Sequence, residues 1–118
     1  MLKDWIWLTT RKGLGPRGVL QVLDYFGTPE RAFYAGPEQY DQIDGLSFMA
    51  RSALKEKGQE GTDRILGECD RLGIRIMTLH DGNYPERLKE IPDPPAVLYI
   101  RGNQFRFDQQ AAIGILGR

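Results

Sequence analysis

The chain turns twice on glycine, at Lys12-Gly13-Leu14-Gly15-Pro16 and again at Asp44-Gly45-Leu46-Ser47-Phe48. Each turn lies between two stretches whose apolar residues have helical spacing. Glycine permits positive φ and close approach of another segment, while proline and serine suit the first positions of a helix. Each turn therefore opens a helix whose first N–H groups point outward and can receive a phosphate. The repeat predicts a tandem helix-hairpin-helix module, a common reader of the DNA backbone.

The charge of the chain gives little general affinity for nucleic acid. Net charge is zero, with eight basic against seven acidic residues up to Gly58 and eight against nine after it. Non-specific DNA binders usually carry a positive surplus, so any affinity must come from a local cluster. The best candidate is Arg11, Lys12 and Arg17 around the first hairpin. Asp44 in the second hairpin would repel phosphate, which favours a structural role there.

Composition argues against several other classes of site. Cys69 is the only cysteine and follows its apolar neighbours at helical spacing, so we expect a small buried hydrophobe. His80 is the only histidine and precedes a turn, which favours a surface or capping role. We predict no metal site, no cofactor and no catalytic residue. No apolar run approaches a membrane span and no secretory signal begins the chain, so we expect a cytoplasmic protein.

The first half of the chain has the pattern of a helical bundle. Asp4 and Thr28 are expected to cap helices. We predict five short helices over residues 4–10, 16–26, 28–34, 38–43 and 48–57. The predicted core consists of Trp5, Leu8, Leu14, Val19, Leu23, Phe26, Ala32, Phe33, Tyr40, Ile43, Leu46, Met49 and Leu54. Trp7 also has core spacing, which favours packing over stacking on single-stranded DNA.

The second half changes to an α/β pattern after one more amphipathic helix over residues 62–72. Residues 74–79 and 96–101 have the composition of strands, and a helical turn over 84–89 separates them. The nearly all-apolar run 111–117 is typical of a buried parallel strand. We therefore predict a parallel strand–helix–strand start of an α/β sheet. We expect its last strand to be poorly ordered or paired with a neighbouring molecule, because a lone strand cannot bury both faces.

The stretch His80-Asp81-Gly82-Asn83-Tyr84-Pro85-x-x-Leu88-x-x-Ile91-x-Asp93-Pro94-Pro95-x-Val97-Leu98-Tyr99-x-x-Gly102 resembles the DprA/Smf family of bacterial DNA-processing proteins. The N-terminal Trp5-x-Trp7-Leu8, the first hairpin and Phe26-Gly27-Thr28-Pro29-Glu30 also look like that family's leading helical domain. The resemblance implies a mainly α chain: a tandem helix-hairpin-helix (SAM-like) bundle over 1–58, a connecting helix over 59–73, and over 74–118 the truncated start of a Rossmann-like α/β domain.

The resemblance also implies a function. The family binds single-stranded DNA and loads the recombinase RecA onto it during natural transformation, without known catalysis and commonly as a dimer. Its Rossmann-like domain typically opens with an apolar strand and a Gly-x-Arg loop that contacts phosphate, which Gly117 and Arg118 match in part. The candidate DNA-binding residues are therefore Lys12, Gly13, Gly15, Arg17, Gly117 and Arg118.

Two other functions compete with this one. A helical protein-interaction module without DNA binding of its own fits the neutral charge. An enzyme fits poorly, because Gly13-Leu14-Gly15 follows no strand and therefore fails the context test for a dinucleotide site. Salt-dependent binding of single-stranded DNA would separate the first two functions.

Overall fold

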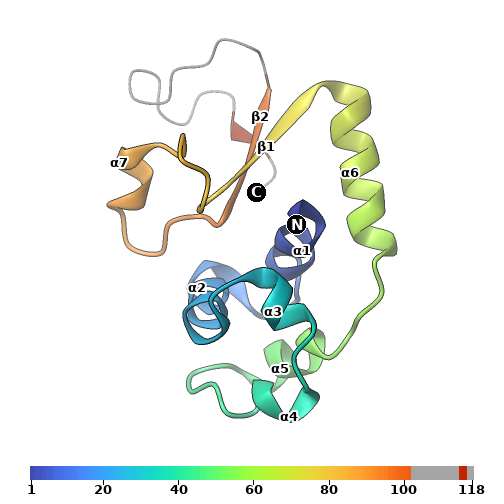
Figure 1. The fold of residues 1–118 in the computed structure, drawn as a ribbon, viewed down its shortest axis with the longest axis vertical. Helices are drawn as coiled ribbons and strands as arrows, with labels where there is room; N and C mark the ends of the chain where they lie inside the picture. Colours follow the sequence, from blue (N-terminus) through green and yellow to red (C-terminus); the bar gives the residue numbers. More distant parts are fainter. Residues whose placement is uncertain (102–114, 117–118) are drawn as a thin grey trace.

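The computed structural model describes residues 1–101 and 115–116 of the chain (Figure 1). Its helices are α1 (Leu2–Thr9), α2 (Gly15–Phe26), α3 (Pro29–Phe33), α4 (Pro37–Tyr40), α5 (Phe48–Leu54), α6 (Glu60–Leu72) and α7 (Glu86–Lys89). Its strands are β1 (Ile74–Thr78), β2 (Val97–Arg101) and β3 (Ile115–Leu116). The described part is mainly helical with one small sheet, which confirms the coarse prediction of fold class.

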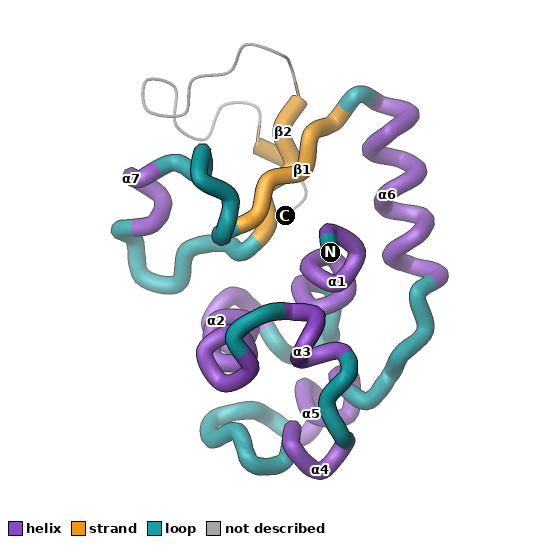
Figure 2. Tube along the Cα trace, viewed as in Figure 1, coloured by secondary structure: helices purple, strands orange, loops and turns teal. Residues whose placement is uncertain are grey.

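Helices α1 to α5 form the bundle, and α6 leads from it to the sheet (Figure 2). The predicted N-caps of α3 and α5 are confirmed. Thr28 Oγ1 accepts a hydrogen bond from the Arg31 N–H at 3.1 Å, and Ser47 Oγ accepts one from the Ala50 N–H at 3.0 Å. These caps fix where α3 and α5 begin, because each satisfies an N–H group that has no partner inside its helix.

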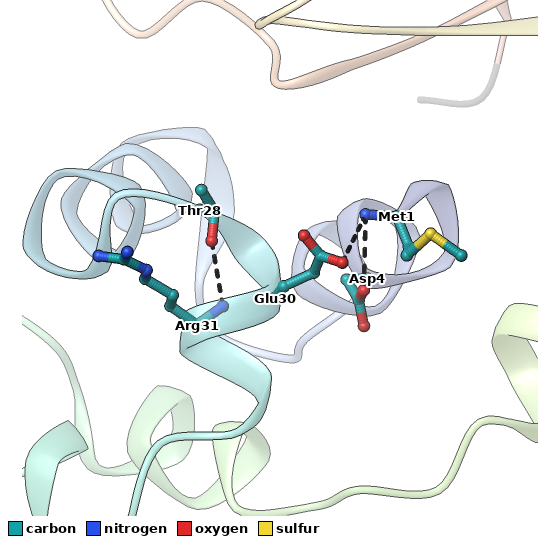
Figure 3. Close-up of polar contacts among 5 residues, drawn as sticks. All are labelled: Met1, Asp4, Thr28, Glu30 and Arg31. Carbon is teal, nitrogen blue, oxygen red and sulfur yellow. Dashed lines mark hydrogen bonds and ion pairs between the residues drawn. The ribbon is translucent and has the colours of Figure 1, made fainter.

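Asp4 does not cap α1, so that prediction is wrong. The helix begins two residues earlier, with Met1 as its N-cap, and Asp4 is buried in its first turn. The amino group of Met1 lies 3.8 Å from the Asp4 carboxylate and 3.1 Å from that of Glu30 in α3 (Figure 3). Burial raises the pKa of Asp4. The acidic residue therefore belongs to a contact between two helices and not to a cap.

The bundle core matches most of the prediction. A single cluster joins buried residues from α1, α2 and α5 with Ala96, just before β2, and with Val97 in β2, so the bundle and the sheet share apolar packing. Trp7 is fully buried, which confirms its place in the core. Met49 was predicted as core and is 59% exposed, because it lies on the outer side of α5 over the first hairpin.

The sheet is antiparallel, and the prediction of a parallel strand–helix–strand unit is wrong. Thr78 pairs with Val97 and Ile74 with Arg101, so residues 79–96 leave and re-enter the sheet at the same end. Helix α7, with four residues, is the only helix in this connection. The connection is therefore a long hairpin loop.

Strand β3 pairs antiparallel with β2, with Tyr99 opposite Leu116 and Ile100 opposite Ile115. These two residues therefore pair within the chain, and the expected pairing with a neighbouring molecule is wrong for them. The rest of the predicted strand 111–117 lies outside the described residues.

The side chains of β2 alternate between the two faces of the sheet, as the period of a strand requires. Val97 and Tyr99 face the bundle, while Leu98 and Ile100 pack with Met77 in a second, smaller cluster on the opposite face. Both faces of this short sheet therefore carry apolar packing.

Candidate nucleic-acid interface

The first hairpin forms a tight turn at the start of α2. Gly13 and Gly15 both have positive φ, +80° and +67°, and Leu14 between them is buried. Leu14 is the N-cap residue of α2 and offers no side-chain acceptor, while Pro16 has no N–H. The N–H groups of Gly15 and Arg17 are therefore the free donors that a helix start presents, and the helix dipole favours an anion there.

Two of the predicted basic residues lie at this turn with exposed side chains. Lys12 is exposed and forms no ion pair within the described part of the chain. The side chain of Arg17 is 78% exposed, and its Nε lies 3.6 Å from Oδ2 of Asp93 in the loop before β2. An exposed pair of this kind contributes little stability, so a phosphate can compete for Arg17.

Arg11 is not a free surface cation. Its Nε donates to the Trp7 carbonyl at 2.9 Å, and its Nη1 donates to the carbonyls of Ala53 and Glu56 at 3.1 and 3.2 Å. Burial lowers the pKa of Arg11, with Glu56 opposing that effect. Arg11 therefore ties the end of α1 to the end of α5 and leaves Lys12 and Arg17 as the basic side chains available at the hairpin.

The second hairpin packs against the bundle, in line with the structural role expected from Asp44. Gln21 of α2 donates from Nε2 to the Asp44 carbonyl at 3.5 Å. Arg51 of α5 donates from Nη2 to the carbonyl of Ile43 at 2.8 Å. Both basic and amide donors at this turn are used to hold its backbone, which leaves little to attract a phosphate.

A groove of about 820 Å³ opens beside the first hairpin, between α2, α6 and the sheet. Gly15 and Pro16 form part of its wall, and Arg64 and Ile65 of α6 form another part. Tyr99 of β2 also lines it. The start of α2 therefore faces a largely apolar groove that contains at least one basic side chain.

Cys69 is buried at the groove, where burial and then Glu68 raise the pKa of its thiol, so it is a poor nucleophile near neutral pH. This confirms Cys69 as a small buried hydrophobe. Within residues 1–101 and 115–116, no group of His, Cys, Asp and Glu side chains could hold a metal ion, and no helix is long and apolar enough to cross a membrane.

Of the predicted site residues, the structure brings Lys12, Gly13, Gly15 and Arg17 together at one turn. Gly117 and Arg118 lie outside the described residues. The groove was not predicted, because its walls come from segments separated by up to ninety residues and share no local motif. The pairing of Arg17 with Asp93 was missed for the same reason.

Comparison with known proteins gives three matches. The sequence model for DNA recombination-mediator protein A matches residues 75–118, which contain the whole stretch from His80 to Gly102. Protein Smf from Synechocystis is 28% identical over 117 residues, which cover 96% of this chain and 29% of that protein. DNA processing protein DprA from Bacillus subtilis is 37% identical over 54 residues, which cover 46% of this chain and 18% of that protein.

The chain spans less than a third of the length of these curated relatives. No solved structure matches it.

Proposed function

Because the chain belongs to the DprA/Smf family of DNA-processing proteins, we propose that it is the N-terminal part of a protein that binds single-stranded DNA. The whole protein would help to load RecA onto that DNA during natural transformation and recombination. Its mechanism would be binding, with no bond made or broken.

The observation that carries the DNA part of this proposal is the geometry of the first hairpin. The N–H groups of Gly15 and Arg17 and the exposed side chains of Lys12 and Arg17 all belong to the turn at the start of α2, and Gly15 also lines the groove. A backbone phosphate would accept from the N–H groups of Gly15 and Arg17, and the neighbouring nucleotide would face the groove. Phosphate contacts of this kind position a strand without reading its sequence.

The division of the chain is part of the same proposal. Residues 1–58 would be a tandem helix-hairpin-helix bundle of SAM-like type, 59–73 a connecting helix, and 74–118 the beginning of a Rossmann-like domain. Gly117 and Arg118 would add a second phosphate contact in that domain. RecA binding, a dimer and a cytoplasmic location are proposed for the longer protein that the relatives' length implies.

Charge reversal at the hairpin tests the proposed DNA site. Lys12→Glu and Arg17→Glu are each expected to weaken binding of an oligothymidylate roughly threefold to tenfold at low salt. Each should also lower the salt slope by about 0.7, because one phosphate contact is lost. Asp93→Asn should act in the opposite direction, since it releases Arg17 from its ion pair. Fluorescence anisotropy with a labelled strand measures all three.

Arg31→Glu is the matched control, because it makes the same change of charge at an exposed side chain of α3, away from the groove. If Lys12→Glu and Arg31→Glu weaken binding equally, only net charge matters and the hairpin is not the site. If the unmodified chain binds no DNA at low salt, the DNA function of this segment is wrong.

A protein-interaction module is the second candidate function. Phe48 and Met49 are neighbours at the start of α5, and they are 84% and 59% exposed. Two large exposed apolar side chains in sequence favour contact with another protein surface. Capture of a partner that Phe48→Ser abolishes, without any DNA binding, would favour this function over the first.

A further inference from the structure

Three aromatic rings surround the side-chain nitrogen of Lys57, which lies in the segment between α5 and α6. The Nζ atom is 4.8 Å from the ring centre of Trp7, 5.0 Å from that of Phe33 and 4.8 Å from that of Tyr40. It donates to the Phe33 carbonyl at 2.7 Å and to the Tyr40 hydroxyl. The residue as a whole remains exposed.

The surroundings of Nζ disfavour its charged form. The rings remove water from one side of the ammonium group, and the guanidinium of Arg11 stands near the same indole, 5.2 Å from the ring centre. Within the described part of the chain, no carboxylate pairs with Lys57. Attraction between the ammonium and the rings offsets part of this cost, by about 0.5–2 kcal/mol, but desolvation and a like charge oppose it.

The same environment shifts the pKa values of Lys57 and Tyr40. Burial, and then the charge of Arg11, lower the pKa of Lys57 to about 8. Burial raises the pKa of Tyr40 to about 12, so its hydroxyl stays protonated where Lys57 titrates. Glu56 is the adjacent carboxylate in the chain, and its charge acts on Arg11. At pH 7 about a tenth of Lys57 is therefore a neutral amine, a far larger share than for a lysine of ordinary pKa.

We propose that Lys57 is an acylation site, whose Nζ attacks the carbonyl carbon of a small acyl phosphate. The C–N bond forms, the bond from the acyl carbon to the phosphate oxygen breaks, and inorganic phosphate leaves with the electron pair. The proton lost from Nζ goes to water. The product is a neutral amide, and neither oxidation nor reduction is involved.

Acylation would release the segment that joins α6 to the bundle. This segment is held by the two hydrogen bonds of Lys57 and by the Trp7 indole, whose Nε1 donates to the Glu56 carbonyl at 2.9 Å. An acylated Nζ keeps one N–H, so it cannot make both bonds. Helix α6 begins at Glu60, three residues later, and lines the groove. The reaction itself does not depend on DNA binding.

Incubation of the folded chain with acetyl phosphate tests the proposal. The five lysines are Lys3, Lys12, Lys55, Lys57 and Lys89. Near pH 7.5, Lys57 should be acetylated roughly tenfold faster than Lys55, because its larger share of neutral amine outweighs the lower nucleophilicity of a less basic nitrogen. Its rate should level off above about pH 8, whereas the rates of the other lysines keep rising toward pH 10. Peptide mass spectrometry after short exposures measures each rate.

Unfolding in urea is the control, because all five lysines should then react within about twofold of one another. A Lys57 rate no faster than that of Lys55 in the folded chain overturns the proposal. A Lys57 rate that still exceeds the Lys55 rate in urea also overturns the proposal, since local sequence would then explain the difference. Hydrogen exchange over residues 55–62 should rise at least severalfold in the chain acetylated at Lys57, and unchanged exchange would refute release of the segment.

Discussion

Replacing Trp7 with alanine is expected to cost about 3–5 kcal/mol, which is a large part of the total stability of a typical protein, about 5–15 kcal/mol. Trp7 is fully buried, and its ring packs edge-on against Phe33 with 4.9 Å between ring centres. Its indole N–H also donates a hydrogen bond to the Glu56 carbonyl. Truncation to alanine therefore removes core volume and also removes the donor to that carbonyl. Urea unfolding followed by circular dichroism measures the loss.

Two further variants separate the contributions of Trp7. Trp7→Phe keeps a ring and loses the indole N–H, and we expect it to cost about 1–2 kcal/mol. Phe48→Ala is the matched control, because it removes an aromatic ring that is 84% exposed, and we expect a change below about 0.5 kcal/mol. If Trp7→Ala and Phe48→Ala had similar costs, Trp7 would not be the centre of the bundle core.

Gly13→Ala is expected to destabilise the chain by about 2–3 kcal/mol through two separate effects. The left-handed backbone, with φ of +80°, costs a residue that has a Cβ about 1–2 kcal/mol. The new Cβ would also lie 3.1 Å from Cγ of Met49, which must move. Crowding of this kind typically adds about 1 kcal/mol. Urea unfolding again measures the change.

Gly15→Ala is the matched control for Gly13→Ala. Gly15 also has positive φ, +67°, but nothing lies within 4 Å of a Cβ added there. It should therefore show only the backbone cost. Met49→Ala in the Gly13→Ala background should recover part of the crowding cost. Equal losses at Gly13 and Gly15 would mean that close approach of α5 to the first hairpin is not what requires glycine.

The sequence predicted well those features that depend on a few adjacent residues. Thr28 and Ser47 cap helices as expected, because an N-cap bond joins residues only three apart. The clustering of Lys12, Gly13, Gly15 and Arg17 at one turn was predictable for the same reason. Asp4 was expected to be an N-cap on the same grounds and is not, because the helix starts earlier and the buried carboxylate lies 3.8 Å from the amino group of Met1.

Features that depend on distant segments could not be read from local patterns. An apolar run suggested parallel strands, but strand direction is set by the path of residues 79–96 and not by composition. The rings around Lys57 come from α1, α3 and α4, between 17 and 50 residues away, and no motif links them. Met49 has core spacing within α5, yet it covers a hairpin instead of filling the core.

Mapping amide chemical shifts while titrating single-stranded DNA tests the central claim most directly, that the first hairpin receives a backbone phosphate at the start of α2. With an oligothymidylate of about 15 nucleotides, the amide signals of Lys12, Gly13, Gly15 and Arg17 should shift together. The shifts should saturate at low salt and fade as salt is raised several-fold, because phosphate contacts release counterions. Shifts confined to other residues, such as Phe48 and Met49, or no shifts at these four amides, would contradict the account.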